Sequence, residues 1–394
     1  MSLAGSQQKV FLRLLAELRP HWRRDRNLPA RVSALFAANR AFGSRDRKLY
    51  RELIYTTLRF LPWIEPLLDS DPARATKIVA WLAADLPATR AFRAAHCDDW
   101  PPCPPTVAAK AAQLGASGES LLPPWFTRHC PEGATPPNLD ALHTRAALWL
   151  RLQTANPSPV LAEFSSLGGE LRRSSLLPSA LELLTEADVT KTAAWREGLI
   201  EVQDLGSQLV LGQANIAPGG RWLDACAGAG GKTLQLAALL GPAGHVDAFD
   251  IRTEALRELE IRAARAKLTN VSILAVSATD SYDGVLVDAP CTGSGTWRRA
   301  PHLKWTTSAG DVAKAAERQA ALLAEFSARV RPGGRLIYAT CSLSRMENEE
   351  VVGAFLITHA NFEADGAART ILPAAHNTDG FFFAALRRMQ IGNQ

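Results

Sequence analysis

Two cysteines follow apolar stretches that have the length and composition of buried strands. Cys291 comes shortly after the stretch 284–289, which carries the acid Asp288 near its end, and Cys341 comes directly after the stretch 335–340. A thiolate is a strong nucleophile, and a carboxylate can orient a polar substrate or hold a proton. If the two stretches are neighbouring strands, these groups form a site for covalent catalysis.

A glycine-rich loop follows an earlier apolar stretch, 221–226. Its sequence is Asp224-Ala225-Cys226-Ala227-Gly228-Ala229-Gly230-Gly231-Lys232-Thr233. A nucleotide-hydrolysing P-loop would need glycine in place of Cys226, and a dinucleotide fingerprint would need a third glycine in place of Thr233. The remaining interpretation is the loop of an S-adenosylmethionine-dependent methyltransferase, whose glycines let the backbone approach the cofactor. Asp250 supports this interpretation, because it stands about twenty residues further on, the spacing of acids that bind ribose hydroxyls.

The thiols fit one particular use of a methyl group. Carbon C5 of a pyrimidine is a poor nucleophile until a thiolate adds to C6, which turns the ring into an enamine-like species. The cytosine must also be held through N3, which a carboxylate can do, and a base must remove the C5 proton so that the thiolate can leave. Asp288, Cys291 and Cys341 meet these requirements. The chemistry alone does not decide which thiol attacks.

These residues must be positioned by a sheet, and the chain from about residue 201 predicts one. Apolar and helical stretches alternate in the βαβ manner, which is typical of a doubly wound parallel sheet. Strands are expected at 221–226, 245–250, 271–276, 284–289, 335–340 and 380–386, and helices at 232–240, 253–267, 311–330 and 345–358. Arg331-Pro332-Gly333-Gly334 predicts a turn, and Ser344-Arg345-Met346-Glu347 predicts a capping box at the start of the last helix. Such sheets bind ligands over the carboxyl ends of their strands, where both cysteines are expected.

The first half of the chain has a different character. Residues 7–95 are expected to be helical, residues 98–124 are rich in Pro, Gly and Ser and predict a linker, and residues 125–200 predict a small α+β module. Seven arginines of the helical part could form a phosphate-binding face, although solvated ion pairs explain them equally well. They are Arg13, Arg23, Arg24, Arg45, Arg47, Arg51 and Arg59.

The bulk composition is that of a globular protein with a mild preference for polyanions. The chain has 394 residues, a formal charge of +5 and a pI near 9.0, and its length predicts two or three domains. No apolar stretch is long enough to cross a membrane and the start lacks the apolar segment of a signal peptide, so we expect a cytoplasmic location. Six cysteines do not make a disulfide framework. The spacing of His96, Cys97, Cys103, His129 and Cys130 matches no usual zinc pattern, so no metal is expected.

The second half resembles the RNA cytosine-C5 methyltransferases, the family of the RsmB-type ribosomal RNA methyltransferases and of the NOL/NOP/Sun proteins. The resemblance rests on the glycine loop 224–233 and on Asp288-Ala289-Pro290-Cys291, Arg298-Arg299-Ala300-Pro301-His302-Leu303-Lys304-Trp305 and Ala339-Thr340-Cys341-Ser342. Residues 202–208 and 379–382 are similar to the family's entry and exit signatures. The resemblance covers residues 200–394 and implies a Rossmann-like methyltransferase domain.

The resemblance also implies a role for each site residue. Cys341 would be the nucleophile and Cys291 would assist product release, whereas DNA cytosine methyltransferases use a Pro-Cys thiol as the nucleophile. Asp288 would contact N3 of the cytosine, and Lys232 would belong to the catalytic set. S-adenosyl-L-methionine would be bound by Cys226, Ala227, Gly228, Ala229, Gly230, Gly231, Lys232, Asp250, Ser277, Asp280 and Asp288.

Two departures from the family pattern concern the cofactor. The loop has Gly228-Ala229-Gly230-Gly231 where the family has Ala-Pro-Gly-Gly. The acid usual after the third strand is replaced by Ser277, and Asp280 is the alternative contact for the adenine.

Two looser resemblances concern the first half. Residues 45–59 are similar to the NusB-like RNA-binding domain of the RsmB type, and Leu150-Arg151-Leu152-Gln153 is similar to the family's small RNA-facing subdomain, although the family commonly has Asn at Gln153. We therefore expect four regions. They are a helical NusB-like RNA-binding domain at 1–97, a Pro-rich linker at 98–124, a small α+β RNA-facing subdomain at 125–200 and a Rossmann-like methyltransferase domain at 201–394.

The predicted function is S-adenosylmethionine-dependent methylation of C5 of a cytidine in RNA through a covalent cysteine–C6 adduct. The expected substrate is 16S ribosomal RNA, and the expected state is a monomer. Two alternatives stay open: a transfer RNA cytosine-C5 methyltransferase, and a catalytically inactive RNA-binding or ribosome assembly factor.

Overall fold

The chain folds as two units that are not continuous in sequence. The computed structural model describes residues 2–275 and 281–390. One unit, here the helical unit, contains residues 1–145 and 296–309, and the other, the sheet unit, contains residues 146–295 and 310–394. The expected boundaries at 97, 124 and 200 all fall inside these units.

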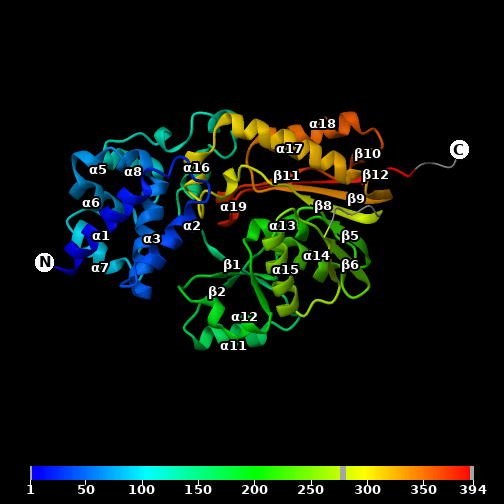
Figure 1. Cartoon of the computed structure of the whole chain (residues 1–394), viewed down its shortest axis with the longest axis horizontal. Helices are drawn as coiled ribbons and strands as arrows, with labels where there is room; N and C mark the ends of the chain where they lie inside the picture. Colours follow the sequence, from blue (N-terminus) through cyan, green and yellow to red (C-terminus); the bar gives the residue numbers. More distant parts are fainter. Residues whose placement is uncertain (1, 276–280, 391–394) are drawn as a thin grey trace. The chain divides into compact units, whose positions relative to one another are not determined.

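The helical unit is built from short and medium helices around one apolar core (Figure 1). Leucines and aromatic residues at helical spacing, such as Phe11, Leu14 and Leu53, are fully buried in it, as the helical periodicity predicts. Its elements are α1 (Leu3–Leu18), α2 (Leu28–Ala38), α3 (Ser44–Arg59), α4 (Leu61–Ile64), α5 (Leu67–Ser70), α6 (Pro72–Leu82), α7 (Arg90–Cys97), α8 (Val107–Leu114), η1 (Glu119–Leu121), α9 (Phe126–His129), α10 (Pro136–Leu142) and α16 (Leu303–Thr306).

The stretch expected to be a linker, 98–124, is part of the helical core. It contains α8 and η1, and Val107, Ala111 and Leu121 are buried against the other helices. The Nε1 of Trp63 donates to the carbonyl oxygen of Ser117 at 2.9 Å, which fixes the loop between the two elements. The prolines mark turns here rather than a flexible connection, because the few apolar residues between them have a core to enter.

Residues 296–309 leave the sheet unit and enter the helical unit. Trp297 is fully buried with its ring 4.6 Å from the ring of Phe126, measured between centroids. The Nε1 of Trp305 donates to the carbonyl oxygen of Leu58 at 2.6 Å. The motif 298–305 of the sequence analysis thus lies within this helical structure.

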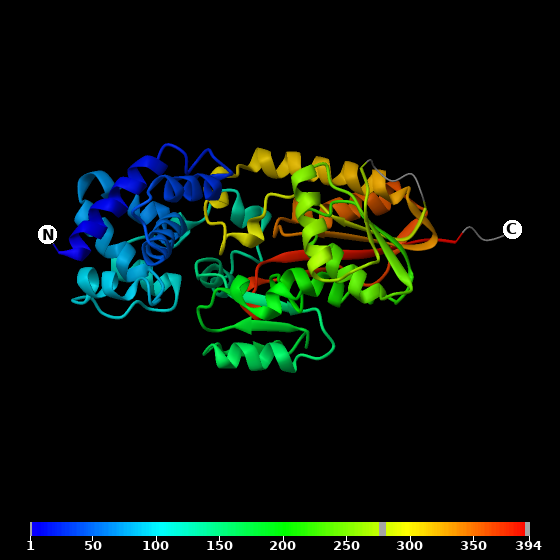
Figure 2. The same cartoon turned by 60° about the horizontal axis from the view of Figure 1, so that its bottom comes forward.

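The sheet unit begins with a small antiparallel sheet in the order β2-β3-β1-β4. Helix α11 lies along one face of it (Figure 2), where Val160 and Phe164 pack against Leu150 and Leu181. The elements are β1 (Leu148–Leu152), α11 (Ser158–Ser166), β2 (Leu171–Arg173), β3 (Ala180–Leu183), η2 (Val189–Lys191), α12 (Ala193–Arg196) and β4 (Ile200–Val202).

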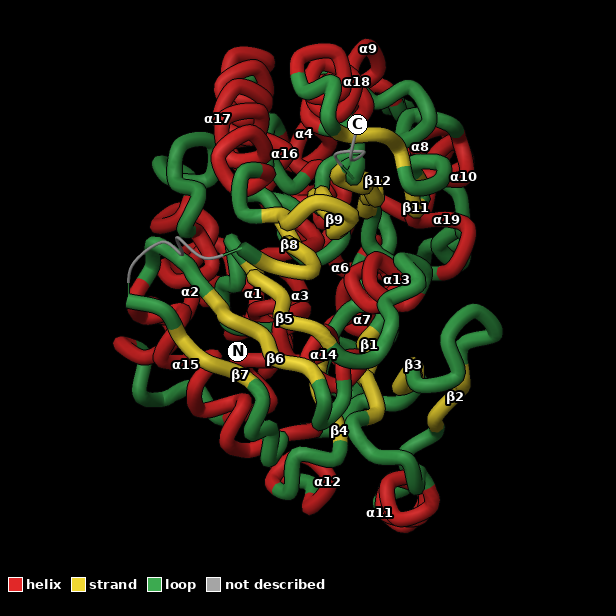
Figure 3. Tube along the Cα trace, turned by 90° about the vertical axis from the view of Figure 1, so that its right-hand side faces the viewer, coloured by secondary structure: helices red, strands yellow, loops and turns green. Residues whose placement is uncertain are grey.

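The large sheet has eight strands in the order β10-β12-β9-β8-β5-β6-β7, with β11 paired to β12 (Figure 3). β5 to β9 are parallel and β12 is antiparallel to β9, which confirms the predicted Rossmann-like fold. The elements are α13 (Leu205–Gly212), β5 (Gly220–Asp224), α14 (Gly231–Leu240), β6 (Gly244–Ala248), α15 (Thr253–Arg265), β7 (Val271–Ile273), β8 (Tyr282–Asp288), η3 (Ser294–Thr296), α17 (Ala309–Ser327), β9 (Val330–Thr340), η4 (Arg345–Glu347), α18 (Glu349–Thr358), β10 (Phe362–Ala364), β11 (Arg369–Ile371), α19 (Pro373–His376) and β12 (Phe381–Arg388).

Helices cover both faces of the large sheet. α17 and α18 lie over one face, and α13 and α14 lie over the other (Figure 1). Alternate residues of the strands enter the two cores: Leu286 packs towards α14, and its neighbours Val285 and Val287 pack towards α17 and α18.

The predicted turn at 331–334 is an irregularity within β9. Tyr282 pairs with Val330 and Gly284 pairs with Arg335, so four residues of β9 face one residue of β8. Gly333 has φ +76°, a conformation that glycine adopts without strain. The glycines therefore shift the register of β9 rather than precede the strand.

Candidate active site

Both cysteines of the sequence analysis lie at the carboxyl edge of the large sheet. β8 and β9 are parallel neighbours with Asp288 opposite Ala339, so the chain leaves both strands on the same side. The Sγ atoms of Cys291 and Cys341 lie 3.2 Å apart, and both thiols are free. The neighbouring strands that the chemistry requires are therefore present.

The two cysteine loops are held together by backbone hydrogen bonds. Gly295 donates its N–H to the carbonyl oxygen of Cys341 at 3.0 Å and accepts from the N–H of Gly380 at 2.8 Å. A Cβ atom on Gly295 would lie 2.1 Å from the carbonyl oxygen of Gly380, so the close approach requires glycine. This contact gives a structural reason for Gly380 in the exit signature.

Glu347 binds both cysteine loops, whereas its position in the sequence predicted a capping box at a helix start. The predicted capping box fails, because Ser344 makes no side-chain cap bond and Glu347 is fully buried in the turn η4. One carboxylate oxygen accepts from the N–H of Thr292 at 2.8 Å, and the other accepts from the hydroxyls of Thr292 at 2.5 Å and Ser342 at 2.6 Å. Gln319 of α17 adds a donor at 3.0 Å.

The surroundings of Cys291 favour its protonated thiol. Hydrogen bonding to Cys341 raises the pKa of the Cys291 thiol well above its usual value, and burial and the charge of Glu347 raise it further. At 3.2 Å the two sulfurs are within hydrogen-bonding distance, and either thiol can donate to the other.

Lys232 and Asp288 form an ion pair beside the cysteines. Lys232 lies in the first turn of α14, and its Nζ donates to an Asp288 carboxylate oxygen at 2.9 Å. The ammonium also lies 5.0 Å from the ring centroid of Phe381, a cation–π contact. The lysine side chain is 7% exposed and the aspartate 31%, so the aspartate is the partner open to a ligand.

The glycine loop has the conformation that its sequence predicts. Gly228 and Gly230 have φ +53° and +87°, and a Cβ atom on Gly230 would lie 2.7 Å from Leu259. Ala227 donates its N–H to the carbonyl oxygen of Phe249 at 2.9 Å, which fixes the loop to the end of β6. The loop thus presents backbone at the N-terminus of α14, a geometry suited to an anionic group.

Two arginines donate hydrogen bonds to backbone carbonyl oxygens of the glycine loop. Arg262 of α15 donates to the carbonyl oxygen of Ala229 at 2.5 Å, and Arg151 of β1 donates to that of Gly231 at 2.7 Å. Arg151 is buried, and burial lowers its pKa to about 9. Glu201 of β4 pairs with Arg262 at 3.3 Å.

The side chain of Arg151, part of the motif compared with an RNA-facing subdomain, is therefore directed at the glycine loop. Gln153 of the same motif accepts from Arg151 at 2.9 Å and donates to the carbonyl oxygen of Gly198 at 3.0 Å. Neither contact could be read from the local pattern, since the glycine loop lies about eighty positions further along the chain, the separation of Arg151 from Gly231.

Asp250 lies at the end of β6, next to the glycine loop. Its carboxylate accepts from the N–H of Gly228 at 2.8 Å and from the guanidinium of Arg252 at 2.9 Å. Burial opposes ionisation of Asp250, but these hydrogen bonds outweigh it and hold the pKa of the carboxyl below its usual value. Asp250 is therefore an anion fixed against the loop.

Asp224 and Cys226 begin the loop, and burial raises the pKa of both side chains. Burial raises the pKa of Asp224 to about 7, against the effect of the Thr233 hydroxyl that donates to it at 2.7 Å. Burial and then the nearby carboxylates raise the pKa of the Cys226 thiol. Burial therefore disfavours the thiolate form of Cys226.

Two predicted cofactor residues cannot be placed. Ser277 and Asp280 lie outside the described residues. A contact of Ser277 or Asp280 with the adenine of the cofactor therefore stays a prediction.

The arginines considered for a phosphate-binding face do not form one set. Arg59 is buried, and its Nη2 donates to the carbonyl oxygen of Arg298 at 3.1 Å, so it belongs to the interior of the helical unit. Arg23 pairs with Glu65 at 2.5 Å and Arg13 with Glu17 at 3.8 Å, while Arg24, Arg45 and Arg51 are exposed and Arg47 is half-buried.

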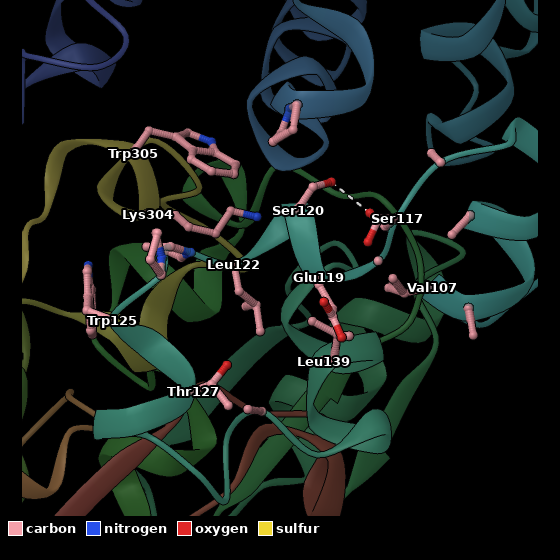
Figure 4. A pocket seen from close by; sticks show the side chains of 18 of the residues that line it. Val107, Ser117, Glu119, Ser120, Leu122, Trp125, Thr127, Leu139, Lys304 and Trp305 are labelled. Carbon is pink, nitrogen blue, oxygen red and sulfur yellow. Dashed lines mark hydrogen bonds between the residues drawn. The ribbon is translucent and has the colours of Figure 1, made fainter.

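The helical unit contains a pocket of about 1790 Å³ (Figure 4). Trp305 and Lys304 lie on one side of it, and Glu119, Leu122 and Leu139 lie on the others. The ammonium of Lys304 is directed away to the ring of His143, at 2.7 Å from its Nε2. The lining therefore offers no set of groups comparable with the two thiols.

Residues 2–275 and 281–390 contain neither a candidate metal site nor a candidate membrane-spanning helix. Within these ranges, no group of three or more His, Cys, Asp or Glu side chains could hold a metal ion. No helix in the same ranges is both long and apolar enough to cross a bilayer.

The chain is similar to known methyltransferases. Residues 213–387 match the family model described as 16S rRNA methyltransferase RsmB/F. The ribosomal RNA small subunit methyltransferase B of Vibrio vulnificus is 31% identical over 264 residues, which are 63% of this chain and 61% of that protein. The chain spans about three fifths of the length of the curated relatives that it matches.

Solved structures show the same fold. A methyltransferase homologue from Pyrococcus horikoshii is 26% identical with a TM-score of 0.60, and the match covers 72% of this chain and 99% of that one. NSun6 from Pyrococcus horikoshii, determined with SFG, is 19% identical with a TM-score of 0.61, and the match covers 68% of this chain and 97% of that one. The comparisons thus support the sequence resemblance: residues 213–387 match the RsmB/F family model, and the curated relatives include proteins named ribosomal RNA small subunit methyltransferase B.

Proposed function

We propose that this chain is an RNA cytosine-C5 methyltransferase that uses S-adenosylmethionine and acts on ribosomal RNA of the small subunit. The observation that carries the proposal is the pair of thiols 3.2 Å apart at the ends of adjacent parallel strands. The ion pair of Asp288 with Lys232 lies at the end of one of these strands. Few reactions other than C5 methylation of a pyrimidine need two thiols and a carboxylate beside a methyl-donor loop.

The residues of the loop fit the cofactor. The glycines at 228 and 230 leave the backbone accessible, and the N-terminus of α14 suits the carboxylate of the methionine part. Asp250 is an anion held against the loop, where ribose hydroxyls would donate to it. SFG, found with NSun6, is an analogue of the same cofactor. When bound, S-adenosylmethionine supplies an electrophilic methyl group.

Each side chain then has one task in the transfer. The Cys341 thiolate forms a bond to C6 of the cytosine, and the electron pair of the C5–C6 double bond becomes the nucleophile at C5. Asp288, whose side chain is partly exposed, holds the ring through N3, and Lys232 fixes that carboxylate. C5 then forms a bond to the methyl carbon, and the electron pair of the broken carbon–sulfur bond stays on the sulfur of the cofactor. When a base removes the C5 proton, the C5–H electron pair re-forms the double bond and the Cys341–C6 bond breaks. Cys291 is 3.2 Å from the leaving sulfur and assists this step.

The charge of the helical unit supports RNA as the partner. Residues 1–145 and 296–309 carry 23 Lys and Arg against 13 Asp and Glu, a formal charge of +10. The sheet unit carries 21 against 26, a formal charge of −5. A polyanion would therefore be attracted by the helical unit, which agrees with the predicted RNA-binding role of the amino-terminal region.

Two single substitutions test the thiol roles. We expect Cys341→Ala to abolish methyl transfer, and Cys291→Ala to accumulate a covalent protein–RNA adduct that migrates as a shifted band. Cys103→Ala, which removes a partly exposed free thiol of the helical unit, is the matched control and should turn over normally. Normal turnover by Cys291→Ala without an adduct would overturn the assignment.

Two further measurements separate the alternatives. Calorimetry with S-adenosylmethionine tests the enzyme against an inactive assembly factor, which would show no binding. Bisulfite sequencing of total RNA from a deletion strain identifies the substrate: loss of one ribosomal RNA methylcytidine supports the proposal, and loss of a transfer RNA methylcytidine supports the other enzyme.

A further inference from the structure

We propose that Glu347 is the positioning residue that holds the two thiols of the site in register. The inference rests on the proposed function and extends it to a residue that does not touch the substrate. Glu347 binds Thr292 and Ser342, the residues that directly follow Cys291 and Cys341. One carboxylate thereby fixes the backbone next to each sulfur.

Both oxygens of the Glu347 carboxylate accept hydrogen bonds from this network. Its two oxygens accept from the N–H and the hydroxyl of Thr292, from the hydroxyl of Ser342 and from the amide of Gln319. Gln319 also donates to the carbonyl oxygen of Pro290 at 3.0 Å, which extends the same network to the other side of Cys291. A buried carboxylate with four donors has one defined orientation, so it can transmit that order to both loops.

The neighbouring residues support the same geometry. Asn348 accepts from the hydroxyl of Thr340 at 2.6 Å and donates to the carbonyl oxygen of Ser342 at 2.9 Å, on either side of Cys341. The hydroxyl of Tyr338 donates to the carbonyl oxygen of Glu347 at 2.5 Å, which fixes the turn to β9. The cysteine loops are thus bound to η4 and not only to each other.

The charge of Glu347 also acts on the pair. It lies near Cys291 and adds to the causes that keep this thiol protonated. A glutamine at 347 would keep the shape of the side chain, and the two hydroxyls could reverse to accept from its amide, so mainly the charge would be lost. An alanine would leave the donors of Thr292, Ser342 and Gln319 without their acceptor.

The test separates positioning from folding. Glu347→Ala should lower kcat about 100-fold and leave KM for S-adenosylmethionine unchanged, since a misplacement of about 1 Å can cost that factor. Glu347→Gln should retain more activity and shift alkylation of Cys291 by iodoacetamide to lower pH. The control is Asp247→Ala, which removes a buried carboxylate of β6 that accepts from the hydroxyl of Tyr282. It should lower thermal stability but not kcat.

A second readout needs no turnover. Oxidation by diamide should join Cys291 and Cys341 into a disulfide rapidly in the wild type, because their sulfurs are 3.2 Å apart, and at least tenfold more slowly in Glu347→Ala. Equal rates in the two proteins, or an equal loss of kcat in Glu347→Ala and Asp247→Ala, would overturn the inference. If the wild type itself transferred no methyl group to RNA, the proposed function would fail while the oxidation test still decided the role of Glu347.

Discussion

Replacing Asp288 by alanine should destabilise the sheet unit more than replacing its partner Lys232 by methionine. The reason is the unequal burial of the pair: the lysine side chain is 7% exposed and the aspartate 31%. Without Asp288, a buried ammonium loses the carboxylate that neutralises it, which costs about 3 kcal/mol. Without the ammonium, Asp288 can turn to water and the methionine can pack on Phe381, so Lys232→Met should cost about 1 kcal/mol.

The double variant sharpens this prediction. The double variant Asp288→Ala/Lys232→Met buries no charge from this ion pair. It should therefore lower the free energy of unfolding by about 1–2 kcal/mol, less than Asp288→Ala alone. Two units need not unfold together, so the readout is hydrogen exchange of the backbone amides of β8 and β9. The exposed pair Lys191–Asp188 serves as the control, and its removal should leave the stability nearly unchanged. A double variant less stable than Asp288→Ala would refute the reasoning.

Three other expectations concern the loop around the proposed cofactor site. Arg262→Ala removes a donor to the carbonyl oxygen of Ala229 and should lower the affinity for S-adenosylmethionine about tenfold by calorimetry, whereas the exposed Arg257→Ala on the same helix should not. Asp250→Asn should lower this affinity by a similar factor, and an unchanged affinity would exclude the ribose contact. The pKa of Asp224 is raised by folding, so the protonated carboxyl contributes to the free energy of unfolding. This contribution is fully present below pH of about 4 and is lost as the pH rises through about 7. The difference in free energy of unfolding between wild type and Asp224→Asn should therefore change across that range, and a constant difference would contradict the prediction.

The position of the thiol site could be predicted from the sequence because its main residues lie at the ends of recognisable strands. An apolar run that ends in an acid or a cysteine shows both the strand and the edge at which the side chain emerges. The parallel order then follows from the alternation of strands and helices, and it brings Cys291 and Cys341 to one edge. The predicted strands at 284–289 and 335–340 correspond to β8 and β9.

The supports of the site could not be predicted in the same way. A serine followed by an acid three residues later is the normal signature of a capping box, yet Glu347 binds Thr292, 55 positions away in the chain. The carboxylate of Glu347 is buried between the two cysteine loops. The donors there and Gln319 outnumber those that the start of a helix would provide. Arg151 is similar, because its partner Gly231 is distant in sequence and begins α14, the helix that follows β5 of the large sheet.

The uneven charge of the chain gives the two units complementary tasks in the proposed reaction. The sheet unit needs acids at its ligand edge, such as Asp250 for the ribose and Asp288 for the base, and its formal charge is −5. Such a unit would repel RNA phosphates, so attraction has to come from the helical unit, with its formal charge of +10. Phosphate binding weakens steeply with salt, whereas contacts of a single cofactor in a partly buried loop do not. Raising the salt should therefore lower the affinity for RNA by orders of magnitude and leave the affinity for S-adenosylmethionine nearly constant, and a parallel decline of both would show that the two tasks are not divided between the units.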